Sequence, residues 1–154
     1  MKGLNILLKS FKNIKSSKIS LHIYGPKGDF DVNNFISENI LYHGIFPFSE
    51  INSILKKYDV LCLPSISYEM MPLVIQEAIN NGLYIIGSDV PGIMELVNQE
   101  TNGVIVERNN VASLTQALID LEINYRRNDN FTIESFRSIS DRILKENEIV
   151  VSDN

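Results

Sequence analysis

Several features that would indicate other classes of protein are scarce in this sequence. The 154 residues include a single cysteine, so no internal disulfide can form. No apolar run approaches the roughly 20 residues that span a membrane, and the N-terminus lacks the apolar core of a secretion signal. These absences predict a cytoplasmic protein of a reducing compartment, without a transmembrane segment.

Positive charge is also in deficit. The chain holds 14 Lys and Arg against 19 Asp and Glu, which gives a formal net charge of −5. Because nucleic-acid phosphates are bound chiefly by surplus cations, this balance argues against a nucleic-acid partner. A bound phosphate would need a few well-placed cations or the amides at a helix N-terminus.

The remaining composition is that of one ordinary globular domain, with 44% apolar and 21% charged residues. We predict a domain over residues 1–146 and a loose tail over 147–154. Cys62 sits within the apolar run 60–63, so we interpret it as a core residue and not as a reactive thiol.

Short β-rich runs alternate with apolar residues at helical spacing, which predicts a doubly wound parallel α/β domain of Rossmann-like form. Helices are expected at 4–14, 49–58, 72–82, 91–97, 111–121 and 131–144, with a weakly helical stretch at 30–38. Strands are expected at 19–24, 40–43, 60–63, 83–87 and 103–106. Ligands of such sheets bind outside the carboxyl ends of the strands, so the loops after Leu63 and Gly87 are the candidate site.

The loop after Leu63 carries two carboxylates eight residues apart, Glu69 and Glu77, on either side of the expected helix start at Pro72. Amides at that start can bind an anion, and Glu77 lies about 7 Å further along the helix at 1.5 Å per residue. This offset suits a diphosphate and the hydroxyls of its ribose. Taken alone, the helix pattern favours a Glu77 that faces water beside an apolar arc, and Glu69 could be a solvated or capping acid.

The segment 69–78, Glu-Met-Met-Pro-Leu-Val-Ile-Gln-Glu-Ala, resembles the E-x7-E signature of retaining nucleotide-sugar glycosyltransferases, family 4 of the GT-B fold (glycosyl transferases group 1). The resemblance extends over about residues 2 to 144. Further matching landmarks, in the family's order, are Lys2-Gly3, Tyr42-His43-Gly44, Tyr58-Asp59-Val60, Pro64-Ser65, Gly87 to Gly92, Glu95 and Asn102-Gly103.

This resemblance implies the donor-binding, C-terminal domain of a hexosyltransferase that acts in polysaccharide or glycoconjugate synthesis. The donor would be a UDP- or GDP-sugar, with no metal or other cofactor. It also implies residue roles: Glu69 binds the transferred sugar, Glu77 the ribose, and Lys2 the diphosphate. The loop formed by Met70, Met71 and Pro72 would offer backbone amides to the sugar and the phosphates. The main chain near Ile45 and Phe46 would lie against the nucleobase.

The chain departs from the family pattern at its start. Members carry a strand that ends in an Arg before the first helix, and an acceptor-binding domain before that. We therefore expect a sheet edge or central slot without a strand, possible self-association, and donor binding without transfer.

Other candidate residues have ordinary structural interpretations. His22 and His43 lack further ligands at metal spacing, and 25–28 reads as a turn and not as a phosphate loop. Asp89, Gly92 and Glu95 suit a turn with local pairing, and Tyr68 either walls the donor site or anchors the loop. Among other functions, a phosphorylatable receiver would need an acidic cluster that is absent. An epimerase or phosphorylase of GT-B form would share the architecture but not the segment around Glu69 and Glu77. A non-catalytic binding or interaction module stays open as the alternative, although the presence of both carboxylates argues against a decayed site.

Overall fold

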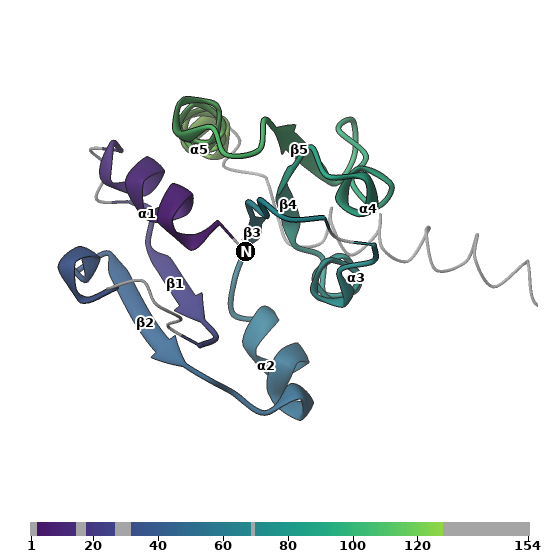
Figure 1. Ribbon diagram of the computed structural model, residues 1–154, viewed down its shortest axis with the longest axis horizontal. Helices are drawn as coiled ribbons and strands as arrows, with labels where there is room; N and C mark the ends of the chain where they lie inside the picture. Colours follow the sequence, from purple (N-terminus) through teal and green to yellow (C-terminus); the bar gives the residue numbers. More distant parts are fainter. Residues whose placement is uncertain (1–2, 15–17, 27–31, 69, 128–154) are drawn as a thin grey trace, which may run out of the picture.

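The computed structural model describes residues 3–14, 18–26, 32–68 and 70–127, and it has the predicted alternation of helices and strands (Figure 1). The first half contains α1 (Leu4–Lys12), β1 (Leu21–Tyr24), the 3-10 turn η1 (Val32–Phe35), β2 (Ile40–Gly44), the 3-10 turn η2 (Phe48–Glu50) and α2 (Ile51–Leu55). The second half contains β3 (Val60–Leu63), α3 (Leu73–Asn80), β4 (Tyr84–Ser88), α4 (Pro91–Met94), β5 (Gly103–Val106) and α5 (Val111–Arg127).

All the paired strands run parallel, as expected, but they form two sheets. One sheet has the order β1-β2, with Leu21 opposite Ile40, and the other has the order β3-β4-β5. Within the described residues, the facing edges of β1 and β3 have no strand between them. The interruption lies where a central slot was predicted.

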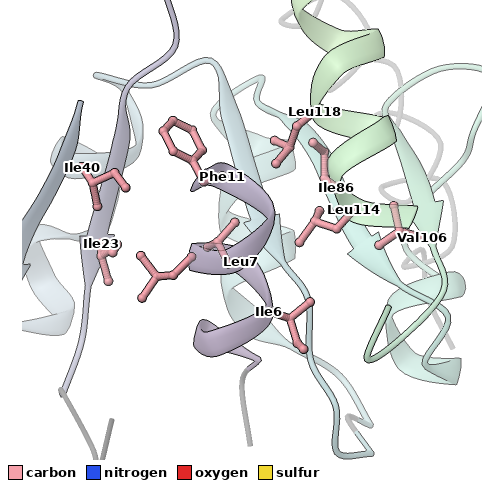
Figure 2. Packing of buried hydrophobic residues seen from close by; sticks show 10 residues of the cluster. Ile6, Leu7, Phe11, Ile23, Ile40, Ile86, Val106, Leu114 and Leu118 are labelled. Carbon is pink, nitrogen blue, oxygen red and sulfur yellow. The ribbon is translucent and has the colours of Figure 1, made fainter. Parts of the chain in front are cut away.

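Helix α1 bridges the two sheets. Its buried residues Leu7 and Phe11 pack with Ile23 and Ile40 of the first sheet (Figure 2). The same cluster continues to Ile86 and Val106 of the second sheet and to Leu114 and Leu118 of α5. The hydroxyl of Ser10 donates a 3.1 Å hydrogen bond to the carbonyl of Val111, which ties α1 directly to the start of α5. A single apolar layer therefore covers one face of both sheets.

The opposite face of the second sheet is covered by α2, α3 and α4. Ile85 of β4 points to this side and its neighbour Ile86 to the side of α1, and both are fully buried. Strands buried on both faces read as continuous apolar runs, which explains why 83–87 shows no polar alternation. Ile51, Leu55, Leu63, Ile75, Ala78, Leu83, Val90, Ile93 and Val97 complete this second cluster.

Several predicted boundaries shift by a few residues. Pro72 has ψ 100° and is the N-cap of α3, because an extended ψ places it just before the helix. Gly82 ends α3 as predicted, with a positive φ of 79°. Its amide donates to the carbonyl of Ile79, and the amide of Leu83 donates to the carbonyl of Ala78. The helix predicted at 131–144 and the tail at 147–154 lie outside the described residues. No helix in the described ranges is long and apolar enough to cross a membrane.

Candidate functional site

The loops after β3 and β4 leave their strands at the same edge of the second sheet, because neighbouring parallel strands end together. Leu63 lies opposite Gly87, and Ser88 lies opposite Val106, so β3, β4 and β5 finish in register. The connection from β3 to α3 is the longest of these loops, and it contains the segment singled out from the sequence. The candidate site is built on this edge.

A buried hydrogen bond holds the base of that loop. Ser65 and Ser88 are both fully buried, and the hydroxyl of Ser88 donates to the carbonyl of Ser65 at 2.7 Å. The bond joins the residue after Pro64 to the last residue of β4. Both serines belong to the family landmarks in the sequence, but their pairing could not be predicted from it. The only sequence signal for a structural role was the position of each small polar residue next to an apolar strand.

The start of α1 reaches the same loop. Gly3 is buried, has φ 69°, and accepts hydrogen bonds at its carbonyl from the amides of Ile6 and Leu7. A Cβ atom at Gly3 would collide with the carbonyl of Pro64. Only glycine combines this φ with this close approach. Two helix N-termini, those of α1 and α3, therefore meet the segment that follows β3, while Lys2 lies outside the described residues.

Among the residues that the structure describes, nothing covers the beginning of α3. No side-chain hydrogen bond caps it, and its first described bond joins the amide of Ile75 to the carbonyl of Pro72 at 2.9 Å. Met70 and Met71, just before it, are 80% and 64% exposed. The amides that begin a helix carry partial positive charge, so this end can receive an anion. Glu69 lies outside the described residues.

Glu77 lies one turn into α3 and is half-buried. Its backbone carbonyl accepts from the amide of Asn81 at 3.1 Å and from the side chain of Asn81 at 2.8 Å. The Asn81 side chain also donates to Asn52 at 2.7 Å, which fastens this turn to α2. Among the described residues, no ion pair or hydrogen bond engages the Glu77 carboxylate. The carboxylate is therefore available to water or to a ligand.

The segment expected beside a nucleobase follows β2, in the other sheet. The side chain of Ile45 is 80% exposed, whereas Phe46 is half-buried and meets Tyr24 edge-on with ring centroids 5.6 Å apart. The amide of Gly25 donates to the carbonyl of Gly44 at 2.8 Å, which holds the ends of β1 and β2 together. Phe46 thus anchors the segment and Ile45 projects from it.

Behind that segment lies an aromatic cluster of His22, Tyr24, His43 and Tyr58. The His22 and His43 rings stack with a 2.9 Å approach of Nδ1 to Nε2, and the Tyr24 and Tyr58 hydroxyls are 2.7 Å apart. Burial, followed by the charge of His43, lowers the pKa of His22. Burial and the hydrogen bond to Tyr24 raise the pKa of Tyr58. Within the described residues no group of three potential metal ligands forms.

Asp89, in the loop after β4, is engaged by the loop after β5. Its carboxylate accepts from the amide of Arg108 at 2.8 Å and lies 3.8 Å from Nε of the same residue. This contact supports the structural interpretation of Asp89. Gly92 is buried in α4, and Glu95 is exposed at the end of that helix. Tyr68 is 69% exposed, so it does not anchor the loop by burial.

Residues 1–137 match the family described as glycosyl transferases group 1. The chain belongs to this family. Over 71 residues, 46% of this chain, it is 42% identical to the UDP-Gal:alpha-D-GlcNAc-diphosphoundecaprenol alpha-1,3-galactosyltransferase of Escherichia coli, of which that match covers 18%.

Solved structures agree on the fold. Anabaena HepE in complex with UDP superposes with a TM-score of 0.75 at 17% identity, over 97% of this chain and 44% of that one. Its complex with UDP-glucose gives 0.73 at 18% identity, over 92% and 41%. The group 1 chain thus spans less than half the length of these proteins, and its matching part has their α/β fold.

Proposed function

We propose that this group 1 chain binds a nucleotide-diphosphate sugar at the carboxyl edge of β3 and β4. It would provide the donor half of a retaining hexosyl transfer in polysaccharide or glycoconjugate synthesis. The observation that carries the proposal is the convergence of two helix N-termini, Gly3 with α1 and Pro72 with α3, on the loop after β3. The name of the galactosyltransferase includes UDP-Gal, and HepE was solved in complex with UDP, which together support a uridine donor ahead of a guanosine one.

The diphosphate belongs at the open start of α3. As the sugar leaves, the bond from its anomeric carbon to the diphosphate breaks, and the electron pair stays on the phosphate oxygen. Helix amides that already point to that oxygen stabilise the added charge without reorganisation. In this proposal Lys2 adds a positive charge there, and no metal is required. Because the chain has a net charge of −5, a diphosphate has to be bound by such local donors and not by a general excess of positive charge.

Glu77 receives the ribose in this arrangement. It follows Leu73 by four residues, about 6 Å along the helix, so a diphosphate at the helix start leaves the ribose beside the carboxylate. A carboxylate accepts hydrogen bonds from two neighbouring hydroxyls, and such charge-assisted bonds are strong. Glu69 binds the hydroxyls of the transferred sugar, and the segment at Ile45 and Phe46 borders the base.

The test is titration calorimetry of the chain with UDP-glucose, UDP-galactose and GDP-mannose, repeated with Glu77→Ala. We expect binding of one base class and a loss of about 1 to 3 kcal/mol for the variant, roughly 5- to 150-fold in Kd. Glu100→Ala is the matched control, because Glu100 is exposed before β5, at the opposite edge of the sheet. Equal affinities for Glu77→Ala and the unsubstituted chain would refute the ribose role.

A further inference from the structure

The methionines that the structure describes lie at its surface and not in its core. Of the four in the chain, Met70, Met71 and Met94 fall within the described ranges, and they are 80%, 64% and 52% exposed. None of these three belongs to either apolar cluster of the fold. Methionine is usually buried, because its flexible thioether fills gaps in a core. Exposed thioethers at the candidate site therefore need another explanation.

Helix capping does not explain these exposed side chains. Met71 directly precedes the N-cap Pro72, and an apolar residue at that position commonly packs against the residue four places into the helix. In α3 that place holds Gln76, which is polar, so the apolar pair is incomplete. Pro72 has no side-chain oxygen that could accept from the first helix amides. Among the described residues, no carbonyl accepts from the amides of Leu73 and Val74.

Two oxidisable sulfurs, those of Met70 and Met71, therefore lie beside helix amides that have no acceptor. A thioether sulfur is a weak acceptor, whereas a sulfoxide has a polar S–O bond whose oxygen accepts hydrogen bonds. Three rotatable bonds let each side chain bring that oxygen to the helix start. An oxygen placed there meets the same amides that would bind an anion. Oxidation would thus close the start of α3.

Cys62, the one thiol of the chain, is protected from an oxidant that reaches these methionines. It lies within β3, where desolvation raises the pKa of its thiol to about 12. The thiolate, which is the form that peroxide attacks, is therefore almost absent at neutral pH. A thioether reacts without prior ionisation. Peroxide should thus oxidise the exposed methionines and leave the cysteine reduced.

We propose that Met70 and Met71 form a reversible oxidation site that closes the start of α3 to anions. The oxidant is hydrogen peroxide: the sulfur lone pair attacks one peroxide oxygen, the O–O bond breaks, and the leaving hydroxide takes the proton of the transferred oxygen to become water. The thioether loses two electrons and becomes a sulfoxide. Methionine sulfoxide reductases reverse the change, with a dithiol as the reductant. For the sugar nucleotide, this inference rests on the function proposed above.

The test compares the chain before and after brief treatment with hydrogen peroxide. Mass spectrometry should find sulfoxide at Met70 and Met71 and an unmodified thiol at Cys62. In the oxidised chain without nucleotide, amide exchange at Leu73 and Val74, followed by NMR, should slow severalfold because the amides are then hydrogen-bonded. The Kd of the best-binding nucleotide among UDP-glucose, UDP-galactose and GDP-mannose should rise about tenfold, which corresponds to one competing hydrogen bond.

Two variants show which methionines are responsible. Leucine has nearly the volume of methionine and no sulfur, so a chain with both Met70→Leu and Met71→Leu should have the same Kd before and after peroxide. Met94→Leu is the matched control, because Met94 is also exposed but lies at the end of α4, and it should keep the full rise in Kd. A rise that survives in the double variant, or disappears in Met94→Leu, would contradict the proposal. Both reductases with dithiothreitol should restore the original Kd of the oxidised chain.

The outcomes separate this inference from the proposed function. A sugar nucleotide that binds the reduced and the oxidised chain equally well overturns the inference and leaves the proposed function intact. If no sugar nucleotide binds the reduced chain, the proposed function fails, and exchange at Leu73 and Val74 decides the inference: slowing on oxidation supports a closed helix start, and unchanged exchange overturns it. Methionines 70 and 71 that stay unoxidised while Cys62 reacts would also overturn it.

Discussion

At the residue scale, Gly3 is the position of the candidate site where the structure restricts the residue type most strictly. Its φ of 69° and the nearby Pro64 carbonyl are two independent reasons why no side chain fits. Gly44 has a similar φ of 79° but no atom within 4 Å of an added Cβ. A comparison of substitutions at Gly3 and Gly44 therefore separates the cost of the backbone conformation from the cost of the steric clash.

We predict that Gly3→Ala lowers the free energy of unfolding by at least about 2 kcal/mol, because it adds a clash to a strained φ. Gly44→Ala, which meets only the strained φ, should cost about 1 kcal/mol. Urea unfolding followed by circular dichroism measures both. If the two variants lost the same stability, the contact with Pro64 would have no energetic weight.

His22 makes stability depend on pH. Its pKa in the folded chain is lower than the ordinary 6.5, so below about pH 6.5 the unfolded chain binds more protons than the folded one. The free energy of unfolding should therefore fall as the pH drops from 6.5 toward 5, and this contribution is absent above pH 7. Urea midpoints across this range measure the slope. The slope should become shallower in His22→Gln, and an unchanged slope would show that other groups cause it.

At the element scale, the loop after β3 depends on its attachment to β4. The Ser88 hydroxyl and the Ser65 carbonyl form this bond between two fully buried residues, so loss of the hydroxyl removes a hydrogen bond from the protein interior. The bond lies at the base of the segment that leads to α3. Its strength should affect both stability and the order of the candidate site.

Ser88→Ala should therefore lower the free energy of unfolding by about 1 to 2 kcal/mol and speed amide exchange in residues 65–71. Ser53→Ala is the matched control: its hydroxyl also donates to a carbonyl, that of Glu50, at 2.7 Å, but the bond is exposed. That control should cost less than about 0.5 kcal/mol. Faster exchange spread over the whole chain in Ser88→Ala would indicate global destabilisation and not a local tether.

At the scale of the whole molecule, two parallel sheets share one helical layer while their facing edges stay apart. The chain spans 18% of the galactosyltransferase and 44% of HepE. The candidate site lies at the carboxyl ends of β3 and β4, whereas a cavity between the two sheets lies at the starts of β1 and β3. The residue roles proposed above concern the donor, and none of them is a contact with the acceptor.

We predict that this chain alone binds a nucleotide sugar but transfers no sugar. Incubation with radiolabelled UDP-glucose or UDP-galactose should give no labelled saccharide or glycolipid product, whereas calorimetry should detect donor binding. Labelled product would contradict this prediction. Sedimentation tests the accompanying expectation of self-association, which a strictly monomeric chain would contradict.

The amino-acid sequence by itself determined the parallel α/β class and the Gly82 stop of α3. Both depend on local causes, namely the period of apolar residues and the conformational freedom of glycine. It also led to the loop after Leu63, because a carboxylate pair beside a helix start is a contiguous pattern. The roles of Glu69, Glu77 and Lys2 stay predictions on the same basis.

Only the tertiary structure decided which distant residues meet. Ser65 and Ser88 are 23 positions apart, and Gly3 and Pro64 are 61 apart, so no sequence spacing relates them. The division into two sheets, with a cavity between β1 and β3, has the same origin. Strand pairing and close backbone approach are set by packing in three dimensions, where residues far apart in the chain become neighbours.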